Sequence, residues 1–266
     1  MSFDTKALKN RIKSVNSTLH LTNAMGLVAS SKIKKANANM SAASEYGGSI
    51  QNVIDLLSGS KECEKSPFLN KREGNSVRLI VIAGDRGLAG GYNANIFRFL
   101  RDYPDAEYLP IGKRACDRYG KGYLSSEKFS AADAAELSKR LCNEFLENKF
   151  QKLGIVYTRY VSMMTQTPDI KWLLPIARSK PLKISTIFEP DEITVLKAAV
   201  PEYVAGVITE CVKESFASEV AARRMAMDSA GKNARQIIDN LTIKYNRARQ
   251  GAITQEITEI VAGSGQ

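Results

Sequence analysis

The distribution of proline constrains the fold of this chain more than any other feature of its sequence. Proline lacks a backbone N–H and its ring clashes with the preceding helical turn, so it is rare inside long helices. All eight prolines lie between Pro67 and Pro201. Two proline-free segments, residues 1–66 and 202–266, therefore flank a proline-containing middle. This layout favours a long helix at each end of the chain.

Apolar and small residues in the first segment recur in alternating steps of four and three. A spacing that averages 3.5 residues keeps one stripe of a helix facing a partner along a left-handed supercoil. The spacing predicts a coiled-coil helix over residues 1–60, capped by Asp4 or Thr5 and bent or frayed at Gly47-Gly48. The seam positions are Leu8, Ile12, Val15, Leu19, Thr22, Gly26, Ala29, Ile33, Ala36 and Met40.

The second segment predicts a helix over residues 200–266 that begins at Pro201, because proline is favoured in a first helical turn. Its only long apolar partner is the first seam, so we expect residues 1–60 and 200–266 to form an antiparallel coiled coil. An offset between two runs of seam residues resembles a stutter. The runs are Val204, Ile208, Cys211, Ser215, Ser218, Ala222 and Met225, then Ala230, Ala234, Ile237, Leu241, Tyr245, Ala248 and Ala252.

The middle of the chain changes to strand-like periods. Apolar, β-branched runs at residues 77–83, 107–111 and 153–161 predict strands, and helical spacing at 92–102 and 132–150 predicts helices between them. Residues 170–176 form an expected edge strand because Pro175 interrupts its ladder. The order of elements predicts an α/β fold class, with a Rossmann-like α/β domain over residues 76–190 inserted between the two coiled-coil helices.

Composition limits the classes of protein that this chain can be. It is 44% hydrophobic without any apolar run of about 18 residues, and its start lacks the apolar stretch of a signal peptide, so we expect a folded cytoplasmic protein. Four separated cysteines without a CxxC pair, and a single histidine, predict reduced thiols and no zinc site. The net charge of +10 favours an acidic partner: nucleic acid, anionic lipid or an acidic protein.

A glycine-rich turn, Gly84 to Gly91, follows the first expected strand and precedes a helix. Such a turn can hold phosphate on helix-terminal amides, yet its spacing matches neither GxGxxG nor GxxxxGK[ST]. The second strand is followed by Gly112 and basic residues instead of an acid for a ribose hydroxyl. The alternative is a tight turn in which Asp85 and Arg86 cap or contact a neighbouring segment.

Other candidate sites have simpler interpretations. His20 has no cysteine or carboxylate three or four residues away, and the methionines at helical spacing are typical of core filling, so no metal site is expected. The cluster Lys32-Lys34-Lys35 and the pair Arg223-Arg224 are either solvated helix faces or contacts for an acidic protein. Nucleic acid is disfavoured because aromatic residues do not interleave with these charges.

The last turns of the second helix carry apolar side chains on one side. Ile253, Ile257, Ile260 and Val261 lie at its extreme end, where the shorter first helix does not reach. An exposed apolar patch marks an interaction site, so we expect this end to insert into an apolar collar of a partner; local fraying is the alternative.

Five motifs, in order and over essentially the whole length, carry a resemblance to a known family. The chain resembles the gamma subunit of F-type ATP synthases, the central rotor shaft of that complex. The family often has cysteine where this chain has Ala89, and the inserted dithiol segment of the chloroplast form is absent, so thiol regulation is not expected. The motifs are TNAMGLVASSKIKKA, GDRGLAGGYN, FEPD, ASEVAARRMAMDSAGKNA and YNRARQGAITQEITEIV.

The resemblance implies a non-catalytic subunit that couples proton flow through a membrane ring to ATP synthesis or hydrolysis in its partners. Those partners are the alpha and beta subunits of a catalytic hexamer, the epsilon subunit and the c-ring. The implied location is the cytoplasmic face of a bacterial inner membrane, with membrane association only through partners. No cofactor, metal or catalytic residue is implied in the chain itself.

The resemblance also implies contact residues, carried over by position. Met25 and Lys32 fall near the acidic lever loop of the catalytic subunits, and Phe188 and Glu189 fall where the foot meets the ring. Polar contacts with catalytic-subunit loops are implied for Arg249, Gln250, Thr254 and Glu256.

Two alternatives from other classes remain at this stage. The first is an enzyme with a Rossmann-like nucleotide-binding domain and a helical dimerisation arm, which rests on the glycine turn. The second is a basic coiled-coil protein that binds nucleic acid, which predicts a steep loss of affinity with salt.

Overall fold

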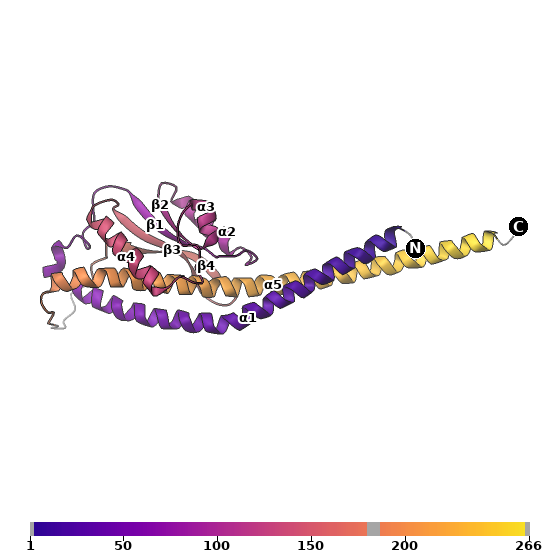
Figure 1. The fold of residues 1–266 in the computed structure, drawn as a ribbon, viewed down its shortest axis with the longest axis horizontal. Coiled ribbons are helices and arrows are strands. Elements are labelled where there is room, and N and C mark those ends of the chain that lie inside the picture. The colour runs from indigo at the N-terminus through magenta and orange to yellow at the C-terminus, as the bar shows by residue number, and fades with distance from the viewer. Residues whose placement is uncertain (1–2, 180–186, 264–266) are drawn as a thin grey trace. The chain divides into compact units, whose positions relative to one another are not determined.

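The computed structural model describes residues 3–179 and 187–263. The chain divides into two compact units. Unit 1 comprises Met1–Ser30 and Arg224–Gln266, and unit 2 comprises Ser31–Arg223. The two long helices, α1 and α5, each run from one unit into the other, so each unit contains a stretch of both helices (Figure 1). No helix in the described ranges is long and apolar enough to cross a membrane.

Helix α1 runs without interruption from Phe3 to Ser58. All ten predicted seam residues from Leu8 to Met40 are buried or half-buried, whereas His20 is exposed, as predicted for a flanking position. The expected fraying at Gly47-Gly48 is wrong, because both glycines lie inside the helix, whereas a bend there stays a prediction. A Cβ at Gly47 would lie 3.3 Å from a carboxylate oxygen of Glu210, so the glycine allows close approach of α5.

Helix α5 is longer than the sequence indicated. It extends from Glu192 to Gly263, so the predicted start at Pro201 is wrong. Just before the helix, the Asp191 carboxylate accepts hydrogen bonds from the Thr194 N–H at 2.8 Å and the Thr194 hydroxyl at 2.7 Å. Asp191 therefore caps the first turn of α5, ten residues before Pro201. Pro201 is tolerated inside the helix.

The two helices are antiparallel within unit 1. A Cβ at Gly26 would lie 3.6 Å from Met227 Cβ, and a Cβ at Gly231 would lie 3.8 Å from Thr22 Oγ1. The Arg224 guanidinium donates to the Gly26 carbonyl oxygen at 3.1 Å. Because positions 26 and 227, like positions 22 and 231, sum to 253, this register places Phe3 opposite position 250.

The seam of α5 in unit 1 differs by one residue from the predicted one at two positions. Ile237 is 46% exposed, whereas its neighbour Ile238 is half-buried. Gly231 is buried where Ala230 was expected to lead the second run. The observed seam keeps the alternating steps of three and four: Gly231, Ala234, Ile238, Leu241, Tyr245, Ala248 and Ala252.

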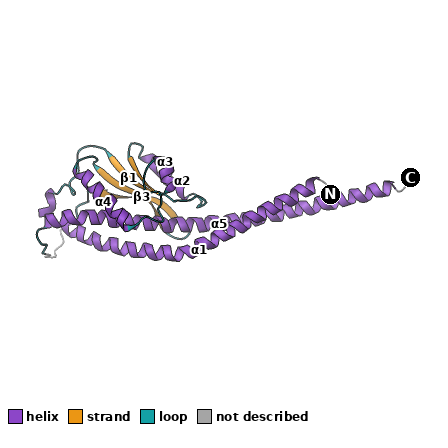
Figure 2. Ribbon diagram, in the orientation of Figure 1, coloured by secondary structure: helices purple, strands orange, loops and turns teal. Residues whose placement is uncertain are grey.

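Unit 2 contains a four-stranded sheet, drawn in orange in Figure 2, and its strand order is β2-β1-β3-β4. The strands are β1 (Val77–Ile82), β2 (Glu107–Ile111), β3 (Lys152–Tyr160) and β4 (Gln166–Leu174). β1 is parallel to both β2 and β3, and β4 is antiparallel to β3. The α/β fold class is therefore confirmed, with β4 at an edge as expected, although Pro175 follows the strand instead of interrupting it.

Helices cover both faces of this sheet. Alternate residues of β1 point to opposite faces, so Ile80 and Ile82 join one core and Leu79 and Val81 the other. The first core also includes residues of α4 (Ala131–Leu146) and of the unit 2 stretches of α1 and α5. The second includes residues of α2 (Tyr92–Phe99) and α3 (Lys113–Tyr119). Burial on both faces explains the continuous apolar run of β1.

Short 3-10 helices at Glu62–Lys65 and Leu100–Asp102 complete the elements. The second of these ends the helical segment that the sequence placed at residues 92–102. Helix α3 was not predicted, since its seven residues include only one buried apolar side chain. The four cysteines are free thiols, and burial raises the pKa of Cys63 to about 11 and that of Cys142 to about 12.

Candidate functional site

The basic segment of α1 in unit 2 contains one cation that already has a partner within the chain. Lys32 Nζ lies 2.5 Å from Glu127 Oε1, and both side chains are about 40% exposed to solvent. Lys34 and Lys35 are exposed on the same helix. Met25, the other contact residue expected on this helix, is half-buried in unit 1. Contact of Met25 and Lys32 with an acidic lever loop stays a prediction.

The loop that carries Glu127 is held by Asp85 of the glycine-rich turn. The Asp85 carboxylate accepts hydrogen bonds from the Ser125 hydroxyl at 2.6 Å, the Ser126 N–H at 2.7 Å and the Glu127 N–H at 3.3 Å. It also accepts from the N–H of Lys113, the first residue of α3. Burial alone would raise the pKa of Asp85, but these hydrogen bonds outweigh it and lower the pKa.

The glycine-rich turn also packs against α5 within unit 2. A Cβ at Gly84 would lie 2.8 Å from Glu219 Cδ, so only glycine leaves room for this carboxylate. Glu219 is 4% exposed and accepts from the Arg223 guanidinium at 2.5 Å. Arg223 also donates to the Gly87 carbonyl oxygen at 3.4 Å. Burial raises the pKa of Glu219, and Arg223 partly offsets that effect.

These contacts favour the tight-turn interpretation of the motif over phosphate binding. The Gly84 N–H donates to Asn93 Oδ1 at 2.9 Å, and the Asn95 N–H donates to the Gly91 carbonyl oxygen at 2.8 Å. The buried Glu219 carboxylate beside the turn would repel a phosphate. The turn therefore joins the sheet, the loop of Glu127 and α5 to one another.

The pair Arg223-Arg224 is not a solvated helix face, which was one of the two interpretations of its charge, and contact of this pair with an acidic protein stays a prediction. Arg223 is 15% exposed at its side chain and pairs with Glu219, and Arg224 donates to a carbonyl of α1 in unit 1. Sequence reasoning missed both contacts. The signal available was the i,i+4 spacing of Glu219 and Arg223, which brings an acid and a base together on one helix face.

The end of α5 in unit 1 extends past the helix that pairs with it. The register places Phe3 opposite position 250, and α5 continues to Gly263. The apolar side chains of these last turns are exposed: Ile253 by 43%, Ile257 by 56%, Ile260 by 70% and Val261 by 64%. The expectation that α1 leaves this end uncovered is confirmed for the described residues.

The expected polar contact residues lie along the same end of α5. Arg249, Gln250, Thr254 and Glu256 are all exposed. The Thr254 hydroxyl donates to the Gln250 carbonyl oxygen at 3.0 Å, one turn earlier in the helix. The structure thus brings the polar and apolar candidates together on one helix end, and their contacts with other subunits stay predictions.

Phe188 and Glu189 precede α5 in unit 2. Phe188 is half-buried and packs against the larger apolar core, whereas Glu189 is exposed. Part of the Phe188 side chain therefore anchors this segment to the unit. A contact of these two residues with a membrane ring stays a prediction.

Sequence comparisons match this chain over nearly all of its length. The family model described as ATP synthase matches residues 4–265. The ATP synthase gamma chain of Ruminococcus albus is 40% identical over 278 residues, which cover 97% of both chains. The ATP synthase gamma chain of Moorella thermoacetica is 37% identical over 272 residues, which cover 97% of this chain and 96% of the relative.

Solved structures share the fold at lower identity. A chain of the Euglena gracilis mitochondrial ATP synthase, in a structure of OSCP, F1 and the c-ring, is similar with a TM-score of 0.68 and 17% identity. It covers 97% of this chain and 93% of its own. A chain of the central stalk and c-ring structure from Tetrahymena thermophila has a TM-score of 0.63 and 20% identity, and covers 79% of this chain and 99% of its own.

Proposed function

We propose, from the premise that this chain belongs to the ATP synthase gamma chain family, that it is the central rotor shaft of an F-type ATP synthase. Its role is to couple rotation of a membrane ring, driven by proton flow, to ATP synthesis or hydrolysis in other subunits. The family membership rests on the match of residues 4–265 and on relatives of 37% and 40% identity.

The observation that carries the proposal is the uncovered end of α5. A helix end with four exposed apolar side chains, about 13 residues past the register position of Phe3, is unfavourable in water unless a partner covers it. A collar of apolar residues at the top of the catalytic hexamer, formed by alpha and beta subunits, is a partner of matching chemistry. The exposed polar residues just before this end then face catalytic-subunit loops.

The mechanism follows from the asymmetry of a coiled coil inside a ring of subunits. Each angular position presents a different face to each catalytic subunit, so the shaft binds the open and closed states of that subunit with different free energies. A ligand shifts a conformational equilibrium only by such a difference. Rotation therefore changes which catalytic subunit is open, and the chemistry of ATP takes place in those subunits.

The basic surface of α1 supplies the electrostatic part of this coupling. Exposed Lys34 and Lys35, together with the Lys32 that Glu127 now holds, attract an acidic lever loop of a catalytic subunit. The α/β part of unit 2 is the foot that contacts the c-ring, in part through Phe188 and Glu189, and the epsilon subunit. The protein thus lies at the cytoplasmic face of a bacterial inner membrane, attached to it only through partners.

Reconstitution tests the proposal. The purified chain is mixed with the alpha and beta subunits of its own complex, and ATP hydrolysis and the angular motion of a probe fixed to the foot are measured. The expected result is a stoichiometric complex in which ATP drives rotation of the probe, while the chain alone hydrolyses no ATP. A chain that forms no complex, or that hydrolyses ATP after rigorous removal of the other subunits, would overturn the proposal.

A further inference from the structure

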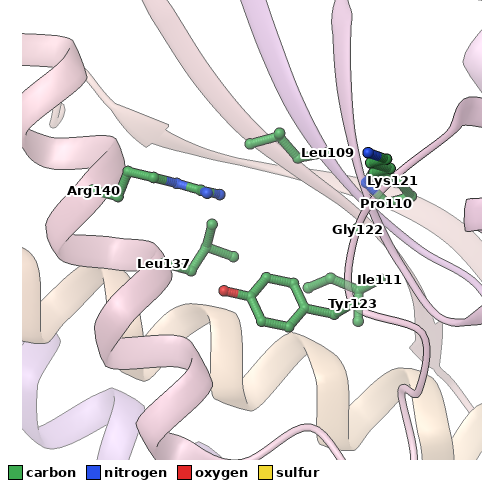
Figure 3. A pocket seen from close by; sticks show the side chains of 8 residues that line it. All are labelled: Leu109, Pro110, Ile111, Lys121, Gly122, Tyr123, Leu137 and Arg140. Atoms are coloured by element: carbon green, nitrogen blue, oxygen red, sulfur yellow. The ribbon is translucent and has the colours of Figure 1, made fainter.

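A cavity of about 300 Å³ opens at the free edge of the sheet in unit 2, between β2 and α4 (Figure 3). Its floor is apolar and comes from Leu109, Ile111 and Leu137. Its polar groups are the side chains of Lys121, Tyr123 and Arg140. In Figure 3 the Arg140 guanidinium extends into the space above Leu137, whereas the Tyr123 hydroxyl points toward α4 from below Leu137.

The wall opposite α4 is a short segment fastened to the edge of β2. The Tyr123 N–H donates to the Pro110 carbonyl oxygen at 3.0 Å, and the Gly112 N–H donates to the Tyr123 carbonyl oxygen at 2.7 Å. A Cβ at Gly122 would overlap the Pro110 carbonyl oxygen, so glycine is required for this close approach. The Tyr123 ring packs edge-on against Phe129 with centroids 5.0 Å apart. The wall is thereby held in place before any ligand binds.

The cavity has an excess of positive charge. Arg140 and Lys121 are exposed, and neither forms an ion pair with any carboxylate of residues 3–179 and 187–263. No carboxylate lines the cavity. Burial raises the pKa of the Tyr123 hydroxyl, and Glu136 and Asp133 of α4, both outside the lining, raise it further, while Arg140 lowers it. The two cations are therefore available to a negatively charged group.

The edge of β2 is not suited to pairing with an additional strand from a partner. Pro110, the fourth of the five residues of β2, is buried and has no N–H to donate to an added strand, and the Tyr123 N–H already occupies its carbonyl oxygen. A small molecule with an apolar body has no such requirement. The cavity volume lies at the lower end of the range for ligand pockets, roughly 300–1,000 Å³, which favours a ligand of fragment size.

We propose that this cavity binds a small amphipathic carboxylate, with a short aliphatic body over Leu109, Ile111 and Leu137 and its anionic head between Arg140 and Lys121. Such a ligand bridges α4 and the edge of β2, which Arg78 also connects through its ion pairs with Glu107 of β2 and Glu144 of α4. The site is distinct from the helix surfaces assigned to rotation and does not depend on that function.

Three probes with the same six-carbon body but different head groups test the proposal: hexanoate, 1-hexanol and hexylammonium. Each is titrated into the full chain while the amide NMR signals of Gly122 and Tyr123 are followed. Hexanoate should give saturable shifts with a dissociation constant on the order of 1 mM, as expected for a ligand of so few atoms. Hexanol should bind about tenfold more weakly, and hexylammonium more weakly still.

Substitutions separate this site from general surface binding. Arg140→Gln and Lys121→Gln each remove one cation from an exposed position, so folding should be unaffected and the hexanoate affinity should fall about tenfold. The matched control is Lys139→Gln, which removes an exposed cation from the same helix at a position outside the lining and should leave the affinity unchanged.

Equal affinities for hexanoate and hexylammonium would overturn the proposal. Shifts that do not saturate at the Gly122 and Tyr123 amides, or an effect of Lys139→Gln as large as that of Arg140→Gln, would overturn it too. Binding of hexanol as tight as that of hexanoate also contradicts it, because the cavity would then select only the apolar body.

Discussion

The Lys32 ammonium and the Glu127 carboxylate lie 2.5 Å apart, so the middle of the chain holds a cation of the helix that is proposed to face an acidic loop. Glu127 in turn is positioned by its backbone N–H, which donates to Asp85. An acidic loop of a partner that approaches Lys32 must therefore compete with Glu127. The ion pair sets how available this cation is to a partner.

The strength of this pair is the subject of the first prediction. Both side chains are about 40% exposed, so a double-mutant cycle of Lys32→Gln and Glu127→Gln should give a coupling of at most about 1 kcal/mol in the free energy of unfolding. Urea unfolding of the isolated chain measures it. In the complex, Glu127→Gln should strengthen and Lys32→Gln should weaken attachment to the catalytic subunits, with both effects smaller at high salt. Changes in the same direction would contradict the competition.

The second prediction uses two glycines with nearly the same backbone. Gly112 and Gly120 have φ values of 97° and 100°, which residues other than glycine rarely adopt. A Cβ at Gly112 would overlap the Ala83 carbonyl oxygen, whereas a Cβ at Gly120 would meet nothing within 4 Å. Gly120→Ala should therefore cost about 1–3 kcal/mol from strain alone. Gly112→Ala should cost about 1–3 kcal/mol more from overlap, as measured by thermal unfolding, and equal costs would refute the overlap.

The sequence was sufficient to predict the helices and strands that have a local pattern of apolar residues. Steps of four and three along α1 identified a stripe that is buried or half-buried at every predicted position from Leu8 to Met40. The strand at Val77–Ile82 was visible because both of its faces are covered and its residues are all apolar or β-branched apart from Arg78. Periodicity predicts such elements because burial of one face determines which residues can occupy it.

Contacts between segments that are distant in the sequence could not be predicted from it. No local pattern indicates that Glu127 meets Lys32, since 95 residues separate them. The role of Gly84 likewise depends on Glu219 of a different element. The start of α5 was misjudged because Pro201 gave a strong local signal, whereas packing of Leu196 and Val200 into the core extends the helix backward to Glu192.

The third prediction concerns pH and the half-buried carboxyl of Glu214 in α5. Burial raises its pKa above the ordinary value of 4.5, while the hydrogen bond from the Tyr160 N–H and the charge of Lys171 partly offset this. The folded chain therefore binds the proton of the Glu214 carboxyl more tightly than the unfolded chain does. The contribution of this proton to the free energy of unfolding is present below pH 4.5 and is lost as the pH rises through the folded pKa.

Glu214→Gln removes that dependence. The variant should match the parent at about pH 4, where the carboxyl is protonated in both states, and should become more stable than the parent toward pH 7. Urea unfolding at a series of pH values measures the difference. Asp133→Asn is a control that should show the opposite pH dependence. Hydrogen bonds from Ser130 lower the pKa of Asp133, so the contribution of this carboxylate to the free energy of unfolding is lost as the pH falls. A constant difference between Glu214→Gln and the parent would refute the assignment.

The fourth prediction tests the helix pair of unit 1 with two positions on α5. Leu241 is 9% exposed on the seam, and Ile243 is 52% exposed on the outer face. Leu241→Asp places a charge against α1 and should destabilise unit 1 by several kcal/mol. Ile243→Asp should change stability by less than about 0.5 kcal/mol. Helicity during thermal unfolding, followed by circular dichroism, distinguishes them, and equal effects would contradict the observed seam.

The last prediction concerns the uncovered end of α5 and separates folding from assembly. Ile257 and Ile260 are 56% and 70% exposed in the chain alone, so replacing both with Gln removes little buried surface and should leave thermal unfolding of the isolated chain nearly unchanged. In the complex the same side chains are proposed to fill an apolar collar. Full burial of one such side chain contributes about 1.5–3 kcal/mol, so the double variant should bind the catalytic hexamer roughly 100-fold more weakly or worse. Lys244→Gln is the control, since it changes an exposed residue of α5 before this end and should bind as the parent does. Dissociation rates from hexamers assembled with each variant provide the measurement, at equal salt. If the double variant dissociates as slowly as the parent, the exposed isoleucines do not fill a collar and the proposed seat of the shaft is wrong.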